Sequence, residues 1–100
     1  MSIDDLSAQR LAELFRLLGD ASRLKIIGCC LDDPICVSDI AERTALSPSL
    51  VSHHLRLLRA ARILRPMREG RQVFYVAADH HVRQTILDML EHVGEPSEEM

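Results

Sequence analysis

The residues with the clearest capacity for chemistry lie near the end of the chain, where Asp79 and His81 are followed by His92 and Glu95. Imidazole nitrogens and carboxylate oxygens are ligands that zinc accepts in proteins. On a helix that begins at Asp79, His81 and His92 share one polar stripe, because their separation of eleven residues corresponds to about three turns. The spacing therefore indicates a candidate metal site.

One helix cannot bring both imidazoles to a single ion. A rise of about 1.5 Å per residue separates His81 from His92 by roughly 16 Å, whereas zinc–nitrogen bonds are about 2 Å long. In an antiparallel pair of such helices, Asp79 and His81 of one copy would meet His92 and Glu95 of the other, and a twofold axis would create two such sites. The alternative is an ordinary surface helix, on which Asp, His and Glu are common.

Two imidazoles and two carboxylates suit tetrahedral Zn(II), with Co(II) as a spectroscopic surrogate. Pro96 disfavours helical backbone at the residue before it, so we expect Glu95 to lie just beyond the helix. A site with four protein ligands is closed to substrate, and the sequence contains no other nucleophile–base pair or phosphate-binding loop. We therefore expect no enzymatic activity.

The elements that must position these groups follow from apolar spacing and capping residues. Gly19 ends a first helix, Asp20 caps a second, and Ser47-Pro48 begins a longer one. The predicted order is four helices, a β-hairpin and a last helix, over residues 11–18, 20–31, 37–44, 47–61, 64–68 with 72–77, and 79–93. The last helix also has an apolar face suited to pairing, formed by Val82, Ile86, Met89, Leu90 and Val93.

Residues 37–58 indicate a helix-turn-helix, because a short helix, a tight turn and a longer capped helix follow one another. On the longer helix, Val51, Leu55 and Leu58 should face the core, and His54 should be a partly buried structural residue. The opposite face is small and polar, and two arginines flank the Glu69-Gly70 turn of the hairpin. The predicted DNA-binding residues are Ser47, Ser49, Ser52, His53, Arg56, Arg68 and Arg71.

The distribution of charge supports this prediction. The net charge of the chain is −3, yet residues 43–78 contain seven arginines and one acid, while residues 1–42 and 79–100 are acidic. A concentrated positive segment attracts phosphate and can drive salt-dependent DNA binding. A solvated basic surface with no ligand is the alternative.

Length and composition place the chain in a simple class. One hundred residues with 47% hydrophobic composition are typical of one globular domain, here residues 1–100 with 94–100 as a frayed tail. The longest apolar run, residues 26–31, is far shorter than the roughly 18 residues of a membrane span. Three cysteines without an export signal indicate reduced thiols in the cytoplasm.

Several segments together resemble the ArsR/SmtB family of repressors: residues 17–24 (LLGDASRL), 35–41 (ICVSDIA), 47–59 (SPSLVSHHLRLLR), 69–75 (EGRQVFY) and 79–81 (DHH). The likeness covers residues 8–95. It implies a winged helix-turn-helix protein, homodimeric through its terminal helices, that binds operator DNA when metal-free and releases it when metal binds. Within the family, Asp79, His81, His92 and Glu95 resemble the ligand set of the zinc-sensing branch.

The cysteines depart from the thiol-type branch of that family, which carries Cys-Val-Cys in the third helix. Here the segment reads Cys36-Val37-Ser38, so one thiolate is missing. We expect Cys29 and Cys30 to be small core residues. One alternative is a thiol-redox or thiophilic-metal-responsive repressor that uses Cys36 with Cys29 or Cys30. A second is a winged helix that binds proteins rather than DNA.

Metal binding must be transmitted to the DNA-reading helix. A metal-bound histidine normally donates its second ring N–H to an acceptor, and the last carbonyls of a helix have no partner within it. We therefore hypothesise a hydrogen bond from His92 to a carbonyl near Ala61 or Arg62, which would join the metal site to the recognition helix.

Overall fold

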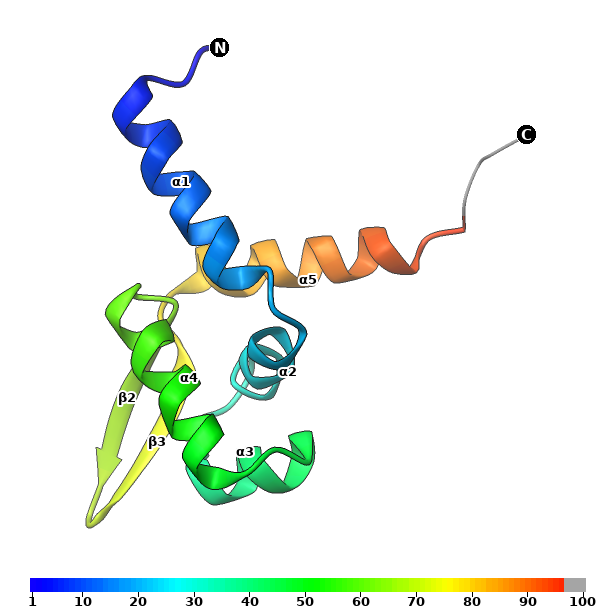
Figure 1. The fold of residues 1–100 in the computed structure, drawn as a ribbon. Coiled ribbons are helices and arrows are strands. Elements are labelled where there is room, and N and C mark those ends of the chain that lie inside the picture. Colours follow the sequence, from blue (N-terminus) through cyan, green and yellow to red (C-terminus); the bar gives the residue numbers. More distant parts are fainter. Residues whose placement is uncertain (97–100) are drawn as a thin grey trace.

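Five helices and three short strands follow one another in the computed structural model, which describes residues 1–96 (Figure 1). The predicted order of helices and hairpin is confirmed, and the last helix ends at Gly94, one residue beyond its predicted end. The predicted tail overlaps residues 97–100, which lie outside the described residues. The elements are α1 Asp5–Leu18, α2 Ala21–Cys29, β1 Ile35–Cys36, α3 Val37–Thr44, α4 Pro48–Ala60, β2 Leu64–Glu69, β3 Gln72–Ala77 and α5 His80–Gly94.

Polar side chains cap α2, α4 and α5 as the sequence predicts, whereas α1 begins at Asp5, six residues before its predicted start, because Asp4 caps it. The side chain of Asp20 accepts the backbone N–H of Arg23 at 3.0 Å, which starts α2. Ser47 caps α4 ahead of Pro48, and Asp79 caps α5. Each cap satisfies an N–H that the first helical turn leaves without a partner, so these boundaries are determined locally.

The sheet has three strands rather than the two that we predicted. β1 pairs antiparallel with β3, with Ile35 opposite Tyr75, and the strand order is β1-β3-β2. Two residues are too few to show the alternation that identifies a strand, so only the neighbouring strand β3 reveals β1. The hairpin turn is also shifted by one residue: Gly70 and Arg71 form it, with Gly70 at a φ of 63°.

We call α2, α3, α4 and the three-stranded sheet the central body, and the hydrophobic core lies between these elements. Ile26, Ile27 and Ile40 are fully buried there. Val51, Leu55 and Leu58 bury the inner face of α4, as predicted from their spacing. The remaining buried apolar residues are Cys30, Leu31, Ile35, Ala41, Ile63, Leu64, Val76 and Ala77.

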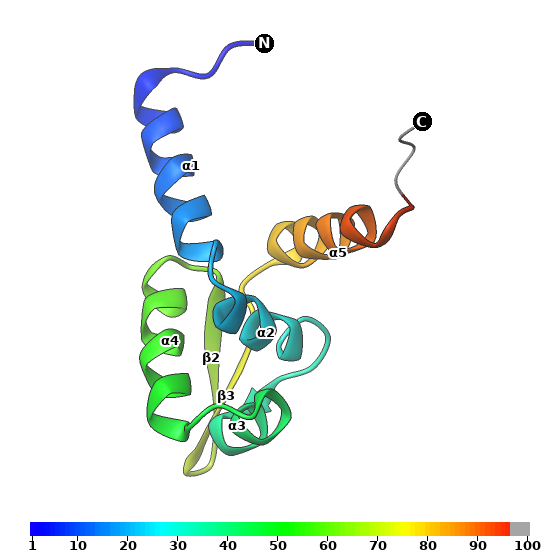
Figure 2. The ribbon, with the colours of Figure 1, turned by 45° about the vertical axis from the view of Figure 1, so that its right-hand side comes forward.

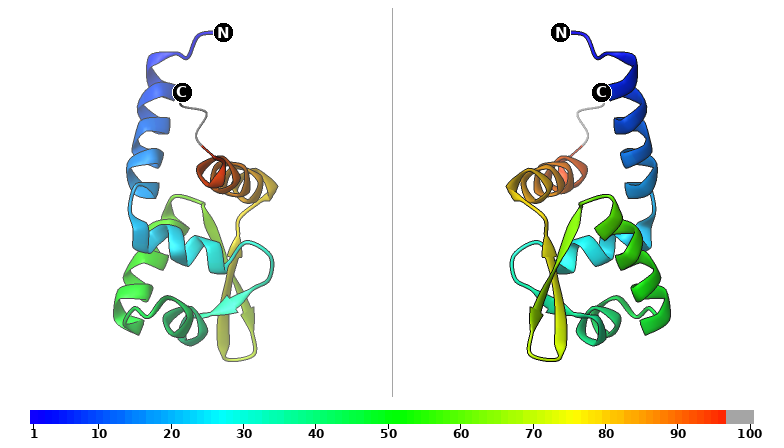
Figure 3. Two further views of the ribbon diagram at one scale, coloured as in Figure 1. Left: turned by 90° about the vertical axis from the view of Figure 1, so that its right-hand side faces the viewer. Right: turned by 90° about the vertical axis from the view of Figure 1, so that its left-hand side faces the viewer.

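The terminal helices, α1 and α5, project from one end of the central body, and the tip of the β2–β3 hairpin marks the other (Figures 1 and 2). Views from the two sides show α5 nearly end-on and α1 extending beyond the sheet (Figure 3). None of the residues in Asp5–Leu18 or His80–Gly94 is buried. Within residues 1–96, every helix is too short or too polar to cross a membrane.

Candidate DNA interface and candidate metal ligands

A tight turn joins α3 to α4 and sets the helix-turn-helix. Ala45 has a φ of 60°, so the chain reverses there through the left-handed region that usually favours glycine. Thr44 closes the end of α3 by donating its hydroxyl to the Ile40 carbonyl at 2.7 Å. Ser47 then accepts the Leu50 N–H at 3.2 Å and begins α4. The two helices of the motif are therefore held at their junction by local bonds.

The predicted DNA-binding residues of α4 lie on its outer face. Ser49, His53 and Arg56 are exposed, and Ser52 is half-buried. Ser47 is exposed too, although its hydroxyl already serves as the cap of α4. This face carries no acid, and it lies opposite the buried leucines that attach α4 to the core.

Arg68 and Arg71 are exposed at the hairpin tip, Arg68 on β2 and Arg71 in the turn. Figure 1 shows this tip and the start of α4 at the same end of the molecule. A helix face and a basic hairpin on one side of a protein can enter a groove and contact the flanking phosphates together. We call these seven residues the candidate DNA interface.

His54 is a structural residue of the recognition helix, as predicted. Its side chain is 6% exposed, and its Nδ1 accepts a hydrogen bond from Arg23 Nε at 3.2 Å. Arg23 also donates to the Leu17 carbonyl at 3.1 Å, so one guanidinium joins α1, α2 and α4. Burial lowers the pKa of His54 below its usual 6.5, and the charge of Arg23 lowers it further. The neutral imidazole is thus the form that fits this contact.

The four predicted metal ligands are not brought together within one chain. Asp79 and His81 lie at the start of α5, whereas His92 lies in its last turn. Because α5 is unbroken between them, the roughly 16 Å separation deduced from helical rise applies. Glu95 is extended, with φ −71° and ψ 144°, which confirms that it lies beyond the helix. Within residues 1–96, no three metal-binding side chains of one chain gather at a common point.

The chemistry of the donors at the start of α5 is compatible with a metal. Asp79 Oδ1 accepts the Val82 N–H at 3.0 Å, which leaves the second carboxylate oxygen for another partner. That N–H and, next, the nearby His81 hold the pKa of Asp79 below its usual 3.8, so it is ionised at neutral pH. His81 is exposed beside it. These two residues can therefore supply one oxygen and one nitrogen ligand from a single turn.

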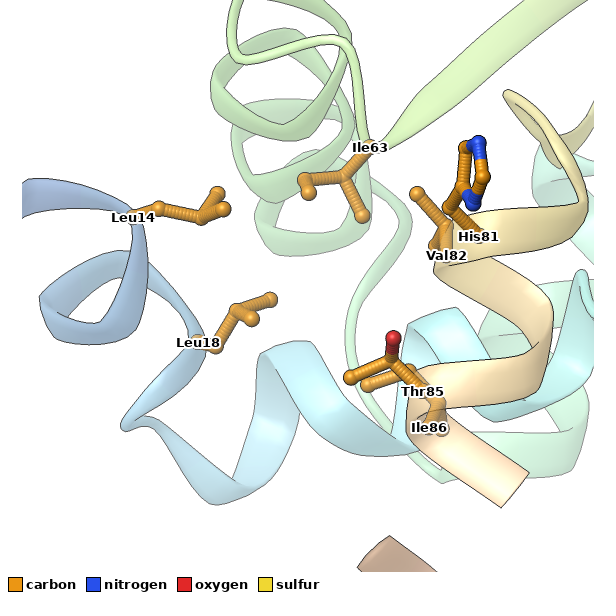
Figure 4. Close-up of a pocket in the computed structure, with 7 residues that line it drawn as sticks. All are labelled: Leu14, Leu18, Ile63, His81, Val82, Thr85 and Ile86. Carbon is orange, nitrogen blue, oxygen red and sulfur yellow. The ribbon is translucent and has the colours of Figure 1, made fainter. Parts of the chain in front are cut away.

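An apolar cavity of about 160 Å³ lies between α1 and α5, next to His81. Leu14 and Leu18 point into it from α1, opposite Val82 and Ile86 of α5, and Ile63 forms its inner wall (Figure 4). The sequence did not predict this cavity, because periodicity shows which residues share a face but not which helices meet.

Beyond this cavity, large apolar side chains remain exposed on both terminal helices. On α5, Met89, Leu90 and Val93 are 53%, 65% and 79% exposed. On α1, Phe15 is 58% exposed. Arg83 of α5 forms an exposed salt bridge with Asp32 of the loop after α2 at 2.8 Å. A helix that exposes a row of large apolar residues is typical of an interface.

The cysteines are placed unevenly. Cys30 is fully buried, and burial raises the pKa of its thiol to about 12, which makes it unreactive at neutral pH. Cys29 and Cys36 are half-buried, and Cys36 Sγ lies 3.3 Å from Ser38 Oγ. The prediction that Cys30 is a core residue is confirmed. The role of Cys36 stays a prediction.

Comparison with known proteins identifies relatives along most of the chain. The family model described as "Bacterial regulatory protein, arsR family" matches residues 20–65, from the cap of α2 to the start of β2. A transcriptional repressor SmtB homolog of Synechocystis is 40% identical over 95% of this chain and 70% of its own length. The HTH-type regulator KmtR of Mycobacterium tuberculosis is 38% identical over 82% of this chain and 65% of its own length.

A further relative, a cadmium resistance regulatory protein CadC homolog of Staphylococcus aureus, is 37% identical over 82% of this chain and 71% of its length. Among solved structures, apo-NmtR superimposes with a TM-score of 0.77 and 30% identity over all of this chain and 87% of its own. A homodimeric winged helix-turn-helix protein of Mycobacterium bovis superimposes with a TM-score of 0.81 and 20% identity, over 100% and 96% of the two chains. The fold is thus a winged helix-turn-helix.

Proposed function

Because this chain belongs to the arsR family of bacterial regulatory proteins, we propose that it is a zinc-responsive repressor, a cytoplasmic homodimer that binds operator DNA without metal and releases it when Zn(II) binds between the subunits. The family and the fold are those of transcriptional regulators, which confirms the expectation of a regulator rather than an enzyme.

The candidate DNA interface supports operator binding. The outer face of α4 is polar, lacks acids and lies at the same end of the molecule as the arginines of the hairpin tip. Ser49, His53 and Arg56 would face base edges in the major groove, while Arg68 and Arg71 would contact phosphates. The relatives named as repressors support the direction of regulation.

Exposed apolar surface supports a dimer through the terminal helices. α1 and α5 have no buried residue of their own and expose Phe15, Met89, Leu90 and Val93. The similar Mycobacterium bovis protein is itself a homodimer. Antiparallel packing of α5 on a second α5 would cover this surface and would bring the start of one helix beside the end of the other.

Such a dimer would complete the metal site. Asp79 and His81 would meet His92 and Glu95 of the partner subunit, giving a tetrahedral N₂O₂ set suited to Zn(II), with Co(II) as surrogate. Glu95 lies beyond the helix, so it would be the least constrained ligand. The bound ion would supply a positive charge and fixed geometry that join the two helices, and a named cadmium-resistance relative is in keeping with a divalent metal.

The coupling to DNA would use the end of α4. Ala61 and Arg62 follow α4 and lie near the start of α5, since Arg62 and Asp79 line a common cavity. His92 of the partner subunit, once bound to metal, would donate its second ring N–H to a main-chain carbonyl there. A coupling free energy of about 1–3 kcal/mol would weaken operator affinity roughly 5–150-fold.

The observation that carries the proposal is that an unbroken α5 holds His81 and His92 on one stripe but too far apart for one ion. Fluorescence anisotropy with the chain's own operator region tests it. Wild-type protein should bind the DNA and release it on Zn(II) addition. His81→Ala and His92→Ala should bind the DNA normally and fail to release it, whereas His80→Ala, one residue away, should respond as wild type. Zinc-driven release by both ligand variants would overturn the proposed site.

The dimer is tested separately by Leu90→Glu. A carboxylate placed in the apolar interface by each subunit should weaken self-association at least tenfold, or by about 1.4 kcal/mol. Sedimentation velocity should then show monomers at concentrations where wild type is dimeric. Glu91→Gln, the neighbouring polar change, should leave the dimer intact. A wild-type monomer at all concentrations would contradict the proposed arrangement.

A further inference from the structure

Four of the seven arginines in residues 43–78 are outside the candidate DNA interface, and three of these, all except Arg43 of α3, lie near the end of α4. Arg59 is in the last turn of α4, Arg62 follows that helix, and Arg65 is near the start of β2. Arg59 lies one turn beyond Arg56, the last α4 residue of that interface, and about 15 Å of helical rise from Ser49. In Figure 1 the end of α4 lies at the end of the hairpin away from its tip. The proposed contacts with bases and with phosphates at the hairpin tip do not include these three arginines.

The three arginines line one cavity of about 480 Å³, which we call the arginine cavity. It lies where α4, β2 and the start of α5 meet, and all three side chains are exposed. Within residues 1–96 the salt bridge formed by an arginine is that of Arg83 with Asp32, so none of the three cavity arginines forms a salt bridge with a described carboxylate. The other lining residues are Leu64, Pro66, Ala78 and Asp79.

The backbone at Arg62 fixes where this side chain leaves the turn. Arg62 has a φ of 59°, and the N–H groups of Arg62 and Ile63 donate to the carbonyls of Arg59 and Leu58. This is the Schellman ending of a helix, whose left-handed position is usually glycine. The turn therefore holds the start of the Arg62 side chain between Arg59 of α4 and Arg65 of β2.

The local field also favours an anion. The C-terminal end of a helix carries a partial negative charge, which repels anions. The Schellman bonds occupy the carbonyls of Leu58 and Arg59 and so reduce that charge at the end of α4. The start of α5 borders the cavity and adds the partial positive charge of a helix N-terminus. The single acid of the lining, Asp79, is ionised and accepts the Val82 N–H with one oxygen, so three guanidinium charges face one negative charge. Guanidinium groups are planar forks that match the oxygens of phosphate.

We propose that the arginine cavity binds a phosphate group through Arg59, Arg62 and Arg65. The group belongs either to a free phosphate-type anion or to a DNA backbone phosphate outside the segment that α4 reads. The site needs neither the bound metal nor the dimer to form, but it shares Asp79 and Arg62 with the zinc proposal, so its test uses metal-free protein.

Thermal unfolding with inorganic pyrophosphate, at constant ionic strength and with a chelator present, tests the first source. A ligand that binds only the folded chain raises the Tm in a saturable way. We expect this rise in wild type and at least a tenfold weaker apparent affinity in Arg59→Ala/Arg65→Ala and in Arg62→Gly, which retains the turn. Arg16→Ala removes the same charge from the exposed surface of α1, outside the cavity and the candidate DNA interface, and should bind as wild type. Equal weakening by Arg16→Ala would overturn the proposal, because general positive charge would then explain the binding.

Non-specific duplex DNA tests the second source. If pyrophosphate has no effect, the double variant should still reduce the slope of log K against log salt, by about 0.9 for each DNA phosphate that the variant no longer neutralises. Arg16→Ala, which removes an exposed arginine of α1, should leave that slope unchanged. No response to pyrophosphate together with an unchanged slope in the double variant would overturn the proposal.

Discussion

Leu58 and Leu90 are both helical leucines, yet Leu58 in the central body is fully buried and Leu90 in α5 is 65% exposed. The same difference in burial separates the whole central body from the terminal helices α1 and α5. The central body buries residues from three helices and the sheet in one cluster, whereas the terminal helices only pack partly buried side chains against its edge. The central body thus holds its own fold, while the outer faces of α1 and α5 are suited to contact another surface.

This difference separates the region proposed to bind DNA from the region proposed to bind metal. The helix-turn-helix is positioned by a core that one chain completes, so its geometry does not depend on a partner. The proposed metal ligands lie instead on a helix whose apolar face one chain leaves open. Two contacts join α5 to the central body: the Arg83–Asp32 salt bridge, and the packing of core residue Ile63 beside Val82 and Ile86. A change in how two copies of α5 pack can reach the central body through these contacts.

The largest expected effect breaks the central body. Leu58→Ala removes a fully buried side chain and should reduce the free energy of unfolding by about 2–5 kcal/mol. Leu90→Ala makes the same chemical change on α5 and should alter the stability of the monomer by at most about 0.5 kcal/mol. Urea denaturation at low protein concentration measures both. Similar losses in the two variants would contradict the distinction between the regions.

A second prediction concerns the contact that attaches the recognition helix to the first two helices. Burial, and then Arg23, lowers the pKa of His54 in the folded state below the ordinary 6.5. Between these two values the unfolded chain binds more protons, so the stability that neutral His54 contributes is complete above about pH 6.5 and is lost as the pH falls through the folded pKa.

The free energy of unfolding, measured from pH 7.5 down to pH 5, should therefore decrease more steeply in wild type than in His54→Gln. The groups that face His54 are Arg23, Asp20 and His53, and among them the negative charge of Asp20 opposes the shift. His53→Gln, an exposed neighbour on the same helix, should retain the wild-type slope. An identical pH dependence in wild type and His54→Gln would show that the buried imidazole does not titrate in this range.

The smallest predicted changes in stability concern two residues with left-handed backbone, Arg62 after α4 and Gly70 in the hairpin turn. Arg62→Gly relieves a left-handed backbone and should stabilise the chain by about 1 kcal/mol, whereas Gly70→Ala introduces the same strain at a φ of 63° and should destabilise it by about as much. Thermal unfolding of the pair, without added anions, measures the two signs. Destabilisation by Arg62→Gly would mean that the guanidinium makes a stabilising contact that outweighs the strain.

Much of the fold could be predicted from local signals. Asp20, Ser47 and Asp79 each satisfy N–H groups within a few residues, so helix starts follow from neighbouring residues alone. Spacing on α4 likewise predicted the buried and exposed faces, including His54. The strand β1 was not predictable, because its two residues adopt extended structure only through pairing with β3.

The candidate sites divide in the same way. The positive segment and the outer face of α4 can be found by counting residues, but seven arginines do not indicate which of them share a cavity. Arg59, Arg62 and Arg65 meet because the turn after α4 leads directly into β2, and the left-handed backbone of Arg62 shapes that turn. The apolar cavity beside His81 likewise depends on α1 and α5 approaching Ile63.

The order of the helices, their caps, the face of α4 that meets the core and the distance between His81 and His92 were determined by the sequence alone, because each depends on bonds and spacing within a few turns. Tertiary structure alone decided the third strand, the partner of His54, the cavity beside His81 and the grouping of three arginines. These depend on residues far apart in the chain, and their contacts form only when the whole core excludes water.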